Sequence, residues 1–262
     1  MTPEQYRRQY LRWRRIYERK GVSIFGNAIK QNLKRIPLDD LNDNNYEVLI
    51  KSSFNDNITF KAYEAFYTEV GRTHARRLDN EVKREEKAFE SEFIRGVLEF
   101  LLNFAGQRII SVNETLAEFI INEIQKRADS GKSISQIVTE IIKQRQFYRP
   151  QLLRIVRTET TSAAGYAADS VSSNTGLILD KMWISATDSR TRRIPEDQFD
   201  HYKMHLVKVP DGEPFEVKNK KGGVELMRFP GDPKGSAGDV INCRCTLVKV
   251  PRRDSDGNLV RR

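Results

Sequence analysis

Apolar residues recur with a helical period from Thr2 to about Thr175, and the period disappears from Gly176 onward. The pattern predicts a first helix that begins at Thr2 and ends at Gly21, and further helices at about 22–36, 43–70, 73–106, 113–130, 133–147 and 150–174. After Gly176, short runs typical of strands occupy 178–186, 205–209, 215–217 and 245–250, and a short helix is expected from Pro195 to about His205.

This change of pattern predicts an α+β fold, with a mostly helical N-terminal half followed by a small α+β domain of short antiparallel strands. We expect a helical region over 1–149, a motif domain over 150–250 and a basic tail over 251–262.

The first helix carries one aromatic stripe, formed by Tyr6, Tyr10, Trp13 and Tyr17 at spacings of four, three and four residues. The favoured interpretation is that these rings face the helical core, and the alternative is docking on a partner.

Positive charge is concentrated at both ends of a chain whose net charge is +9. We expect the first helix to contact nucleic acid or another polyanionic partner, and the alternative is a solvated face. The arginines concerned are Arg7, Arg8, Arg12, Arg14, Arg15 and Arg19. No signal peptide and no membrane-spanning run is present, which predicts a soluble protein of a reducing compartment.

Common catalytic motifs are missing. The chain has no G-x-S-x-G elbow and no phosphate-binding glycine loop, and nothing nearby activates Cys243 or Cys245 as a nucleophile. We therefore expect no catalytic residue.

Metal binding remains open. His201 and His205 would face the same side of a helix, and the thiols of Cys243 and Cys245 could complete a four-ligand structural zinc site. The favoured alternative is two buried thiols that pack as small hydrophobic groups, with no cofactor.

The order of the C-terminal segments resembles the phage Mu F-like family of minor head proteins, also called head morphogenesis proteins. The resemblance rests on "RTETTSAAGYAAD", "KMWISATDSRTR", "EPFEV" and "ELMRFPGDPKGSAGDVINCRCTL", over about residues 150–250. It places Arg157, Glu159, Trp183, Asp188, Arg190, Arg192, Asp232 and Asn242 in a shared structural framework with both cysteines. His201 corresponds to the family histidine at a shifted position, whereas His205 has no counterpart, which narrows the candidate zinc ligands to His201, Cys243 and Cys245.

The resemblance implies a minor structural protein inside the head of a tailed phage, without enzymatic activity. Its implied partners are the portal protein, other head proteins and packaged double-stranded DNA, and its implied location is the virion near the portal vertex, after assembly in the host cytoplasm. The alternative hypothesis is a metal-dependent nucleic-acid enzyme or effector that uses the His/Cys cluster.

Overall fold

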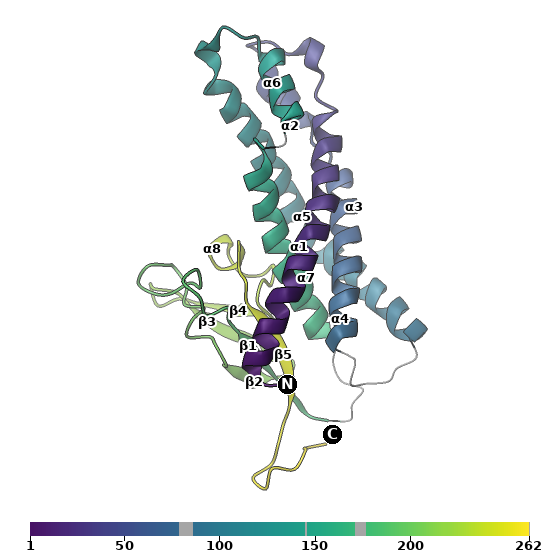
Figure 1. Ribbon diagram of the computed structural model, residues 1–262, viewed down its shortest axis with the longest axis vertical. Helices are drawn as coiled ribbons and strands as arrows, with labels where there is room; N and C mark the ends of the chain where they lie inside the picture. The colour runs from purple at the N-terminus through teal and green to yellow at the C-terminus, as the bar shows by residue number, and fades with distance from the viewer. Residues whose placement is uncertain (79–85, 145, 171–176, 262) are drawn as a thin grey trace. The chain divides into compact units, whose positions relative to one another are not determined.

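The computed structural model describes residues 1–78, 86–144, 146–170 and 177–261. Its helical first part and its small antiparallel sheets confirm the predicted α+β class (Figure 1). The α-helices are α1 (Pro3–Leu33), α2 (Tyr46–Ser53), α3 (Asp56–Phe66), α4 (Arg72–Leu78), α5 (Glu86–Gln125), α6 (Ile134–Lys143), α7 (Arg149–Ser170) and α8 (Ala237–Val240). Short helical turns occupy Leu38–Asp40, Tyr67–Gly71 and Ala128–Ser130.

The first helix does not end at Gly21, as the sequence had suggested, but continues to Leu33. A Cβ atom at Gly21 would lie 2.8 Å from Val156 Cγ1 and 2.9 Å from Phe66 Cε2. Glycine therefore permits a close approach of neighbouring helices here and does not mark a helix end.

Other helix boundaries also differ from the prediction. The helix expected at 43–70 is divided into α2 and α3. Of the helix expected at 73–106, the start lies in α4, residues 79–85 lie outside the described residues, and the rest is joined to the segment expected at 113–130 in α5, which runs without a break to Gln125. The break expected between residues 106 and 113 therefore lies inside the helix, because tertiary packing overrides weak local preferences.

In the described part of the chain, five strands form two small antiparallel sheets. One sheet has the order β2 (Lys208–Pro210), β1 (Leu179–Ile184), β5 (Thr246–Pro251), with Met182 paired to Lys208 on one side and to Val248 on the other. The other pairs β3 (Phe215–Lys218) with β4 (Val224–Met227). All four predicted strand regions contribute a strand, and β4 was not predicted.

The helix expected from Pro195 to His205 is absent, and turns occupy this stretch. Side chains hold the turns: Asp197 Oδ2 accepts from the backbone N–H of Arg193 at 2.9 Å, and Asp200 Oδ1 accepts from that of Lys203 at 2.9 Å. Such side-chain bonds compete with helical backbone bonds.

The chain divides into two compact units that each combine separate stretches of sequence. The first unit contains 1–20, 67–97 and 157–262, and the second contains 21–66 and 98–156. The predicted division at residues 149 and 250 stays a prediction.

In the first unit, the N-terminal part of α1 lies against the three-stranded sheet (Figure 1). Tyr6, Tyr10 and Tyr17 are at most 5% exposed, and Trp13 is partly buried against the same cluster as Tyr6 and Tyr10, so the aromatic stripe faces the core. Successive residues of β1 face opposite sides of the sheet and pack in two apolar clusters. Met182 packs with Tyr6 and Tyr10, and Trp183 packs with the core around β3 and the cysteines.

The second unit is helical and contains a buried polar chain. Thr59 Oγ1 donates to Asn113 Oδ1 at 2.7 Å, Asn113 Nδ2 donates to Asp56 Oδ1 at 2.7 Å, and Asn32 Nδ2 donates to Thr59 Oγ1 at 3.3 Å. Satisfied networks of this kind fix the register of packed helices. The predicted cap of α6 is confirmed, because Ser133 forms a reciprocal capping box with Gln136.

None of the helices in the described ranges is long and apolar enough to span a bilayer.

Candidate metal centre

Three metal-binding side chains meet in the core of the first unit. Cys243 and Cys245 come just before β5, and His201 lies in the turns between β1 and β2. The donor atoms of all three lie within 4.8 Å of one another, and each residue is 2% exposed. The structure therefore brings together the three predicted ligands.

The spacing of the donor atoms matches a tetrahedral zinc ion. His201 Nδ1 lies 3.5 Å from Cys243 Sγ and 3.6 Å from Cys245 Sγ. Zinc–sulfur bonds of about 2.3 Å and zinc–nitrogen bonds of about 2.0 Å at tetrahedral angles separate sulfur from nitrogen by about 3.5 Å.

A carboxylate fixes the orientation of the histidine. His201 Nε2 is hydrogen-bonded to Oδ1 of Asp239, a fully buried residue of α8, so that Nδ1 faces the two sulfurs. Trp183 packs edge-on against the imidazole, with ring centroids 5.5 Å apart. A carboxylate bonded to the remote nitrogen is the usual second partner of a zinc-binding histidine.

The electrostatics of the cluster favour a charged histidine when no metal is present. Burial lowers the pKa of His201, but the facing Cys243 sulfur and the hydrogen bond to Asp239 outweigh it and raise the pKa to about 9. The hydrogen bond to Cys245, together with burial, raises the pKa of Cys243 well above its usual value. Burial acts on Cys245 in the same direction, but its hydrogen bonds, led by that from Cys243, lower its pKa overall. Metal binding would release protons from this cluster, because zinc binds thiolates and a neutral imidazole.

The backbone of Cys243 is held by two helices. Its carbonyl oxygen accepts from Arg14 Nη1 at 2.9 Å and from the hydroxyl of Thr161 on α7. The preceding residue, Asn242, has a φ of 58° and donates its N–H to Thr158 Oγ1 at 3.0 Å. Asparagine tolerates this left-handed conformation better than most residues, which turns the chain into the cluster.

The hydroxyl groups of the "RTETTS" segment (157–162) form hydrogen bonds with the backbone of neighbouring loops. Besides Thr158 and Thr161, Ser162 Oγ donates to Gly231 O at 2.5 Å. Gly231 has a φ of 82°, and a Cβ there would lie 3.0 Å from the backbone N of Ser162. The buried Glu159 accepts from Tyr67 OH at 2.7 Å. Arg157, by contrast, has an exposed side chain and contributes its carbonyl, which accepts from Arg14 Nη2 at 3.1 Å.

The arginines after β1 are arranged around the loop that carries the cysteines. Asp188 forms a two-pronged ion pair with Arg244, the residue between the cysteines, and this hydrogen bonding lowers the pKa of Asp188 to about 2. Arg192 donates to the carbonyl of Ile241. Arg190 is exposed, 3.9 Å from Asp188. The hydrogen bond from Arg192 to Ile241 and the ion pair between Asp188 and Arg244 therefore hold residues 241–244 at both ends.

Asp232 has a local structural role as well. Its carboxylate accepts from the backbone N–H groups of Arg228 at 2.7 Å and Lys234 at 3.0 Å, which closes the Pro-Gly-Asp-Pro turn. Most of the predicted framework residues therefore have structural contacts inside the unit, whereas the side chains of Arg157 and Arg190 are exposed.

His205 does not belong to the cluster. Its Nδ1 accepts from the backbone N–H of Ser185 at 3.3 Å. The four-ligand set with both histidines is wrong, because residues 195–205 form turns and the two imidazoles do not share a helix face.

Two of the six predicted contact arginines lie inside the fold. Arg14 is 3% exposed, and Arg7 donates to Ala186 O at 2.6 Å and also contacts Thr187. Both arginines donate hydrogen bonds to backbone oxygens, and a partner would have to displace these bonds to bind the guanidinium groups. The other four, Arg8, Arg12, Arg15 and Arg19, are exposed.

Sequence reasoning missed Asp239 and the inward role of Arg14. A signal for Asp239 exists, since it is an acid four residues before Cys243 in an otherwise apolar segment. Arg14 has no comparable signal, although it follows Tyr10 by four residues and so lies near the aromatic face.

Comparison with known proteins gives one partial match and two negative results. No family model matches the chain. No solved structure matches it. Over 151 residues the chain is 26% identical to the NAD(+)–arginine ADP-ribosyltransferase EFV of Enterococcus faecalis. The match covers 55% of this chain and 28% of that relative, so the chain spans less than a third of its length.

This match corrects two expectations. The prediction of a structural head protein without enzymatic activity is wrong on this finding, because the relative is named as an enzyme. Membership of the Mu F-like family, a location in the virion, and the portal and DNA partners stay predictions.

Proposed function

We propose that the first unit is a zinc-stabilised module in which Cys243, Cys245 and His201 hold one structural ion. The donor geometry carries this proposal, because both sulfurs lie at the distance from His201 Nδ1 that tetrahedral zinc requires, and all three donor atoms lie within 4.8 Å of one another. No other His, Cys, Asp or Glu of the described residues joins the group, so a water molecule or a backbone oxygen would take the fourth position.

When bound, the ion would crosslink the loop before β5 to the turns between β1 and β2. The chain's own residues prepare this crosslink: Asp239 orients the imidazole, and Arg14 and Thr161 hold the Cys243 backbone. Because each ligand is 2% exposed, substrate has no access to the ion and a structural role is favoured over a catalytic one.

Metal analysis of single variants tests the ligand set. We expect the purified chain to carry about one zinc per molecule, and Cys243→Ser, Cys245→Ser and His201→Gln each to lose most of it, as measured by elemental mass spectrometry. His205→Gln is the matched control and should keep its zinc. Cobalt substitution adds a spectroscopic check, since thiolate ligation produces a charge-transfer band that each cysteine variant should weaken.

Full zinc content in the His201→Gln and Cys245→Ser variants would refute the ligand set. Absence of zinc, after refolding with zinc present, from a chain that is folded by circular dichroism would refute the module itself.

A second candidate function is the transfer of ADP-ribose from NAD+ to arginine, and the E. faecalis relative supports it. In this reaction a guanidine nitrogen bonds to the ribose carbon, the bond to nicotinamide breaks, and a proton is released. We assign no residue of this chain to it. Neither buried cysteine is expected to act as a nucleophile, because the cluster has no access to substrate.

An assay with NAD+ and agmatine tests this candidate. We expect nicotinamide and ADP-ribosyl-agmatine in equal amounts by mass spectrometry, with heat-denatured chain as control. If the folded, zinc-loaded chain releases no nicotinamide above the control, the transferase candidate fails for this chain while the zinc module stands.

A nucleic-acid partner is a separate proposal, because the exposed arginines of α1 support it and the His/Cys cluster does not.

A further inference from the structure

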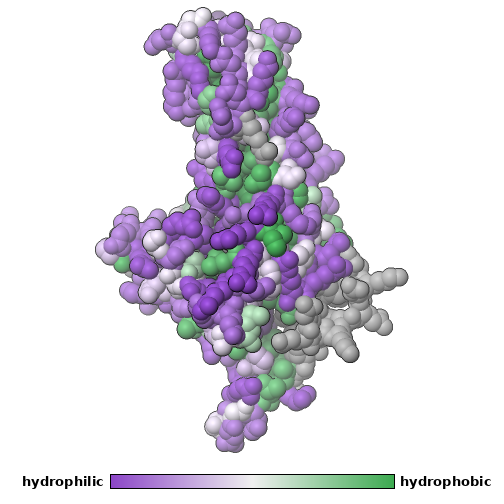
Figure 2. Space-filling view, in the orientation of Figure 1, coloured by the Kyte–Doolittle hydropathy of each residue, from purple (hydrophilic) through white to green (hydrophobic). Residues whose placement is uncertain are grey.

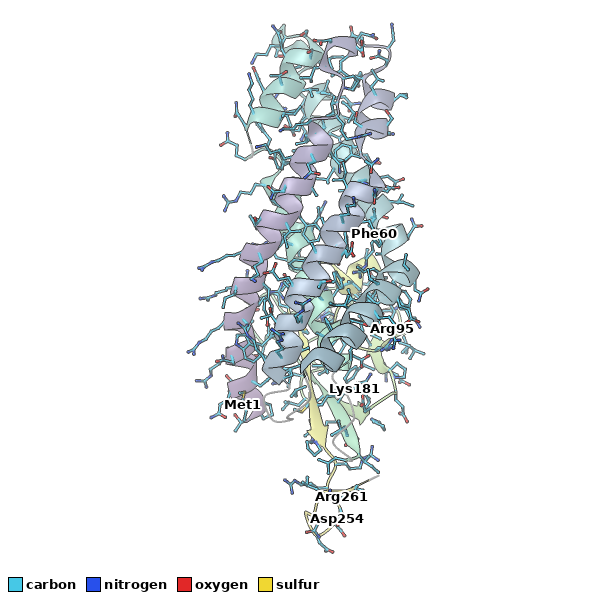
Figure 3. All side chains as sticks on the ribbon, turned by 90° about the vertical axis from the view of Figure 1, so that its right-hand side faces the viewer. Met1, Phe60, Arg95, Lys181, Asp254 and Arg261 are labelled. Carbon is cyan, nitrogen blue, oxygen red and sulfur yellow. The ribbon has the colours of Figure 1, made fainter. Side chains whose placement is uncertain are left out.

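Four arginines form a straight stripe on the outer face of α1. Arg8, Arg12, Arg15 and Arg19 follow one another at spacings of four, three and four residues, and all are exposed. The spacing repeats that of the aromatic stripe two residues earlier, so the two stripes occupy different faces of the helix. In Figure 2, strongly hydrophilic side chains gather along the course of α1, and Figure 3 shows long side chains projecting outward from α1 above the labelled Met1.

Most of this charge is not used inside the fold. Within the described part of the chain, Arg12, Arg15 and Arg19 have no ion pair or side-chain hydrogen bond. Arg8 shares Glu4 with Arg7, at 3.0 Å, with 71% of its own side chain exposed. As far as the described residues show, the stripe thus presents three unpaired cations and one partly neutralised cation to solvent.

The residue type favours phosphate groups. All four cations are arginines, whose planar guanidinium groups bind phosphate oxygens through two parallel hydrogen bonds. From Arg8 to Arg19 the helix rises through eleven residue steps, or about 16 Å at about 1.5 Å per step. Each strand of duplex DNA presents a phosphate about every 3.4 Å along its axis, so about five phosphates fall within this length.

A membrane surface fits less well. A helix that binds in the bilayer interface must insert an apolar face, but the apolar face of this helix is packed inward at Tyr6, Tyr10 and Tyr17. The exposed large apolar residue in this part of α1 is Ile16, at 42%.

We propose that the arginine stripe of α1 is a binding surface for the phosphate backbone of double-stranded nucleic acid. Contacts to phosphate alone carry no sequence information, so binding is expected to be independent of sequence and strongly dependent on salt. This proposal goes beyond the zinc module and does not depend on it.

Fluorescence anisotropy with a labelled 30-base-pair duplex of mixed sequence, at 50 to 200 mM KCl, tests the stripe in the full chain. For about four phosphate contacts we expect affinity to fall about 100-fold over this range. Replacing Arg8, Arg12, Arg15 and Arg19 together with Gln should flatten the slope of log affinity against log salt by about 3 to 4. Gln has nearly the helix propensity of Arg, so melting temperature and zinc content should not change.

The matched control removes the same charge elsewhere in the same unit. Lys208, Lys218, Lys220 and Lys221 are exposed and lie on or between strands. Their joint replacement by Gln should leave most of the salt slope intact.

Three results would overturn the proposal. The first is an equal loss of affinity in both variants, which would mean attraction by net charge alone. The second is no duplex binding at 50 mM KCl. The third is binding to vesicles with 30% anionic lipid, or to polyglutamate, that is as tight as binding to the duplex.

Discussion

At the scale of single residues, the same residue type has different roles within one turn of helix. Arg14 and Arg15 are neighbours, yet Arg14 donates to Cys243 O and Arg157 O from a buried position, whereas Arg15 points to solvent. Burial of an arginine is tolerated here because its donors have oxygen partners, including Glu18 at 2.7 Å. Charge alone therefore does not identify a contact residue.

Asp239 is the residue that most directly tests the orientation of His201. Asp239→Asn keeps a side chain of the same shape but removes the negative charge opposite Nε2, so we expect zinc affinity to fall about 10- to 100-fold. Competition with a chromophoric chelator measures this affinity. Asp254→Asn, in the exposed C-terminal hairpin, should bind zinc as the wild type does, and equal affinities in all three proteins would show that Asp239 does not position the ligand.

At the scale of elements, the buried aromatic face and the exposed basic face of α1 match the faces that the sequence pattern predicts. Tyr10 and Tyr17 are buried on one side, and Arg12 and Arg19 are exposed on another, as a helical period of 3.6 residues requires. Its end was not predictable in this way. Gly21 normally favours a stop, but packing against Val156 explains the glycine and the helix continues.

The turns that carry His201 show the opposite case. A Pro at 195 is typical of the first position of a helix, and in a helix the two histidines four residues apart would share one face. The structure instead uses side-chain hydrogen bonds to close turns, and this places one histidine in the core and the other beside Ser185. Local pattern could not choose between these outcomes, because the deciding partners, Asp239 and Trp183, are distant in sequence.

At the scale of the whole molecule, separate stretches of chain make up each compact unit. The first unit joins the two ends of the chain, so that Tyr6 OH donates to Leu247 O at 3.1 Å across 241 residues. The predicted metal ligands also come from distant positions, and their meeting depends on this closure.

A buried histidine in the same unit predicts how its stability depends on pH. Burial, with a smaller effect of Arg77, lowers the pKa of His74 from 6.5 to about 3. The unfolded chain binds a proton below about pH 6.5 that the folded chain does not bind, so stability is lost as pH falls from about 6.5 toward 3.

Denaturant unfolding at pH 7.5, 6.0 and 5.0 measures this effect. We expect the wild type to lose up to about 1.4 kcal/mol per pH unit from this group, and His74→Phe to lose less. The zinc ligands contribute equally in both proteins, so the difference between the two isolates His74. Parallel pH profiles would show that His74 is not the cause.

The sequence by itself determined the fold class, the aromatic and basic faces of α1, four strand regions and the three residues that meet in the core. These follow from periodicity, from β-forming runs and from the few residue types able to bind a metal. Only the tertiary structure decided that Gly21 continues a helix, that Arg7 and Arg14 donate to backbone oxygens inside the fold, and that Asp239 orients His201. Each of these depends on contacts between segments far apart in the chain, which local pattern does not encode.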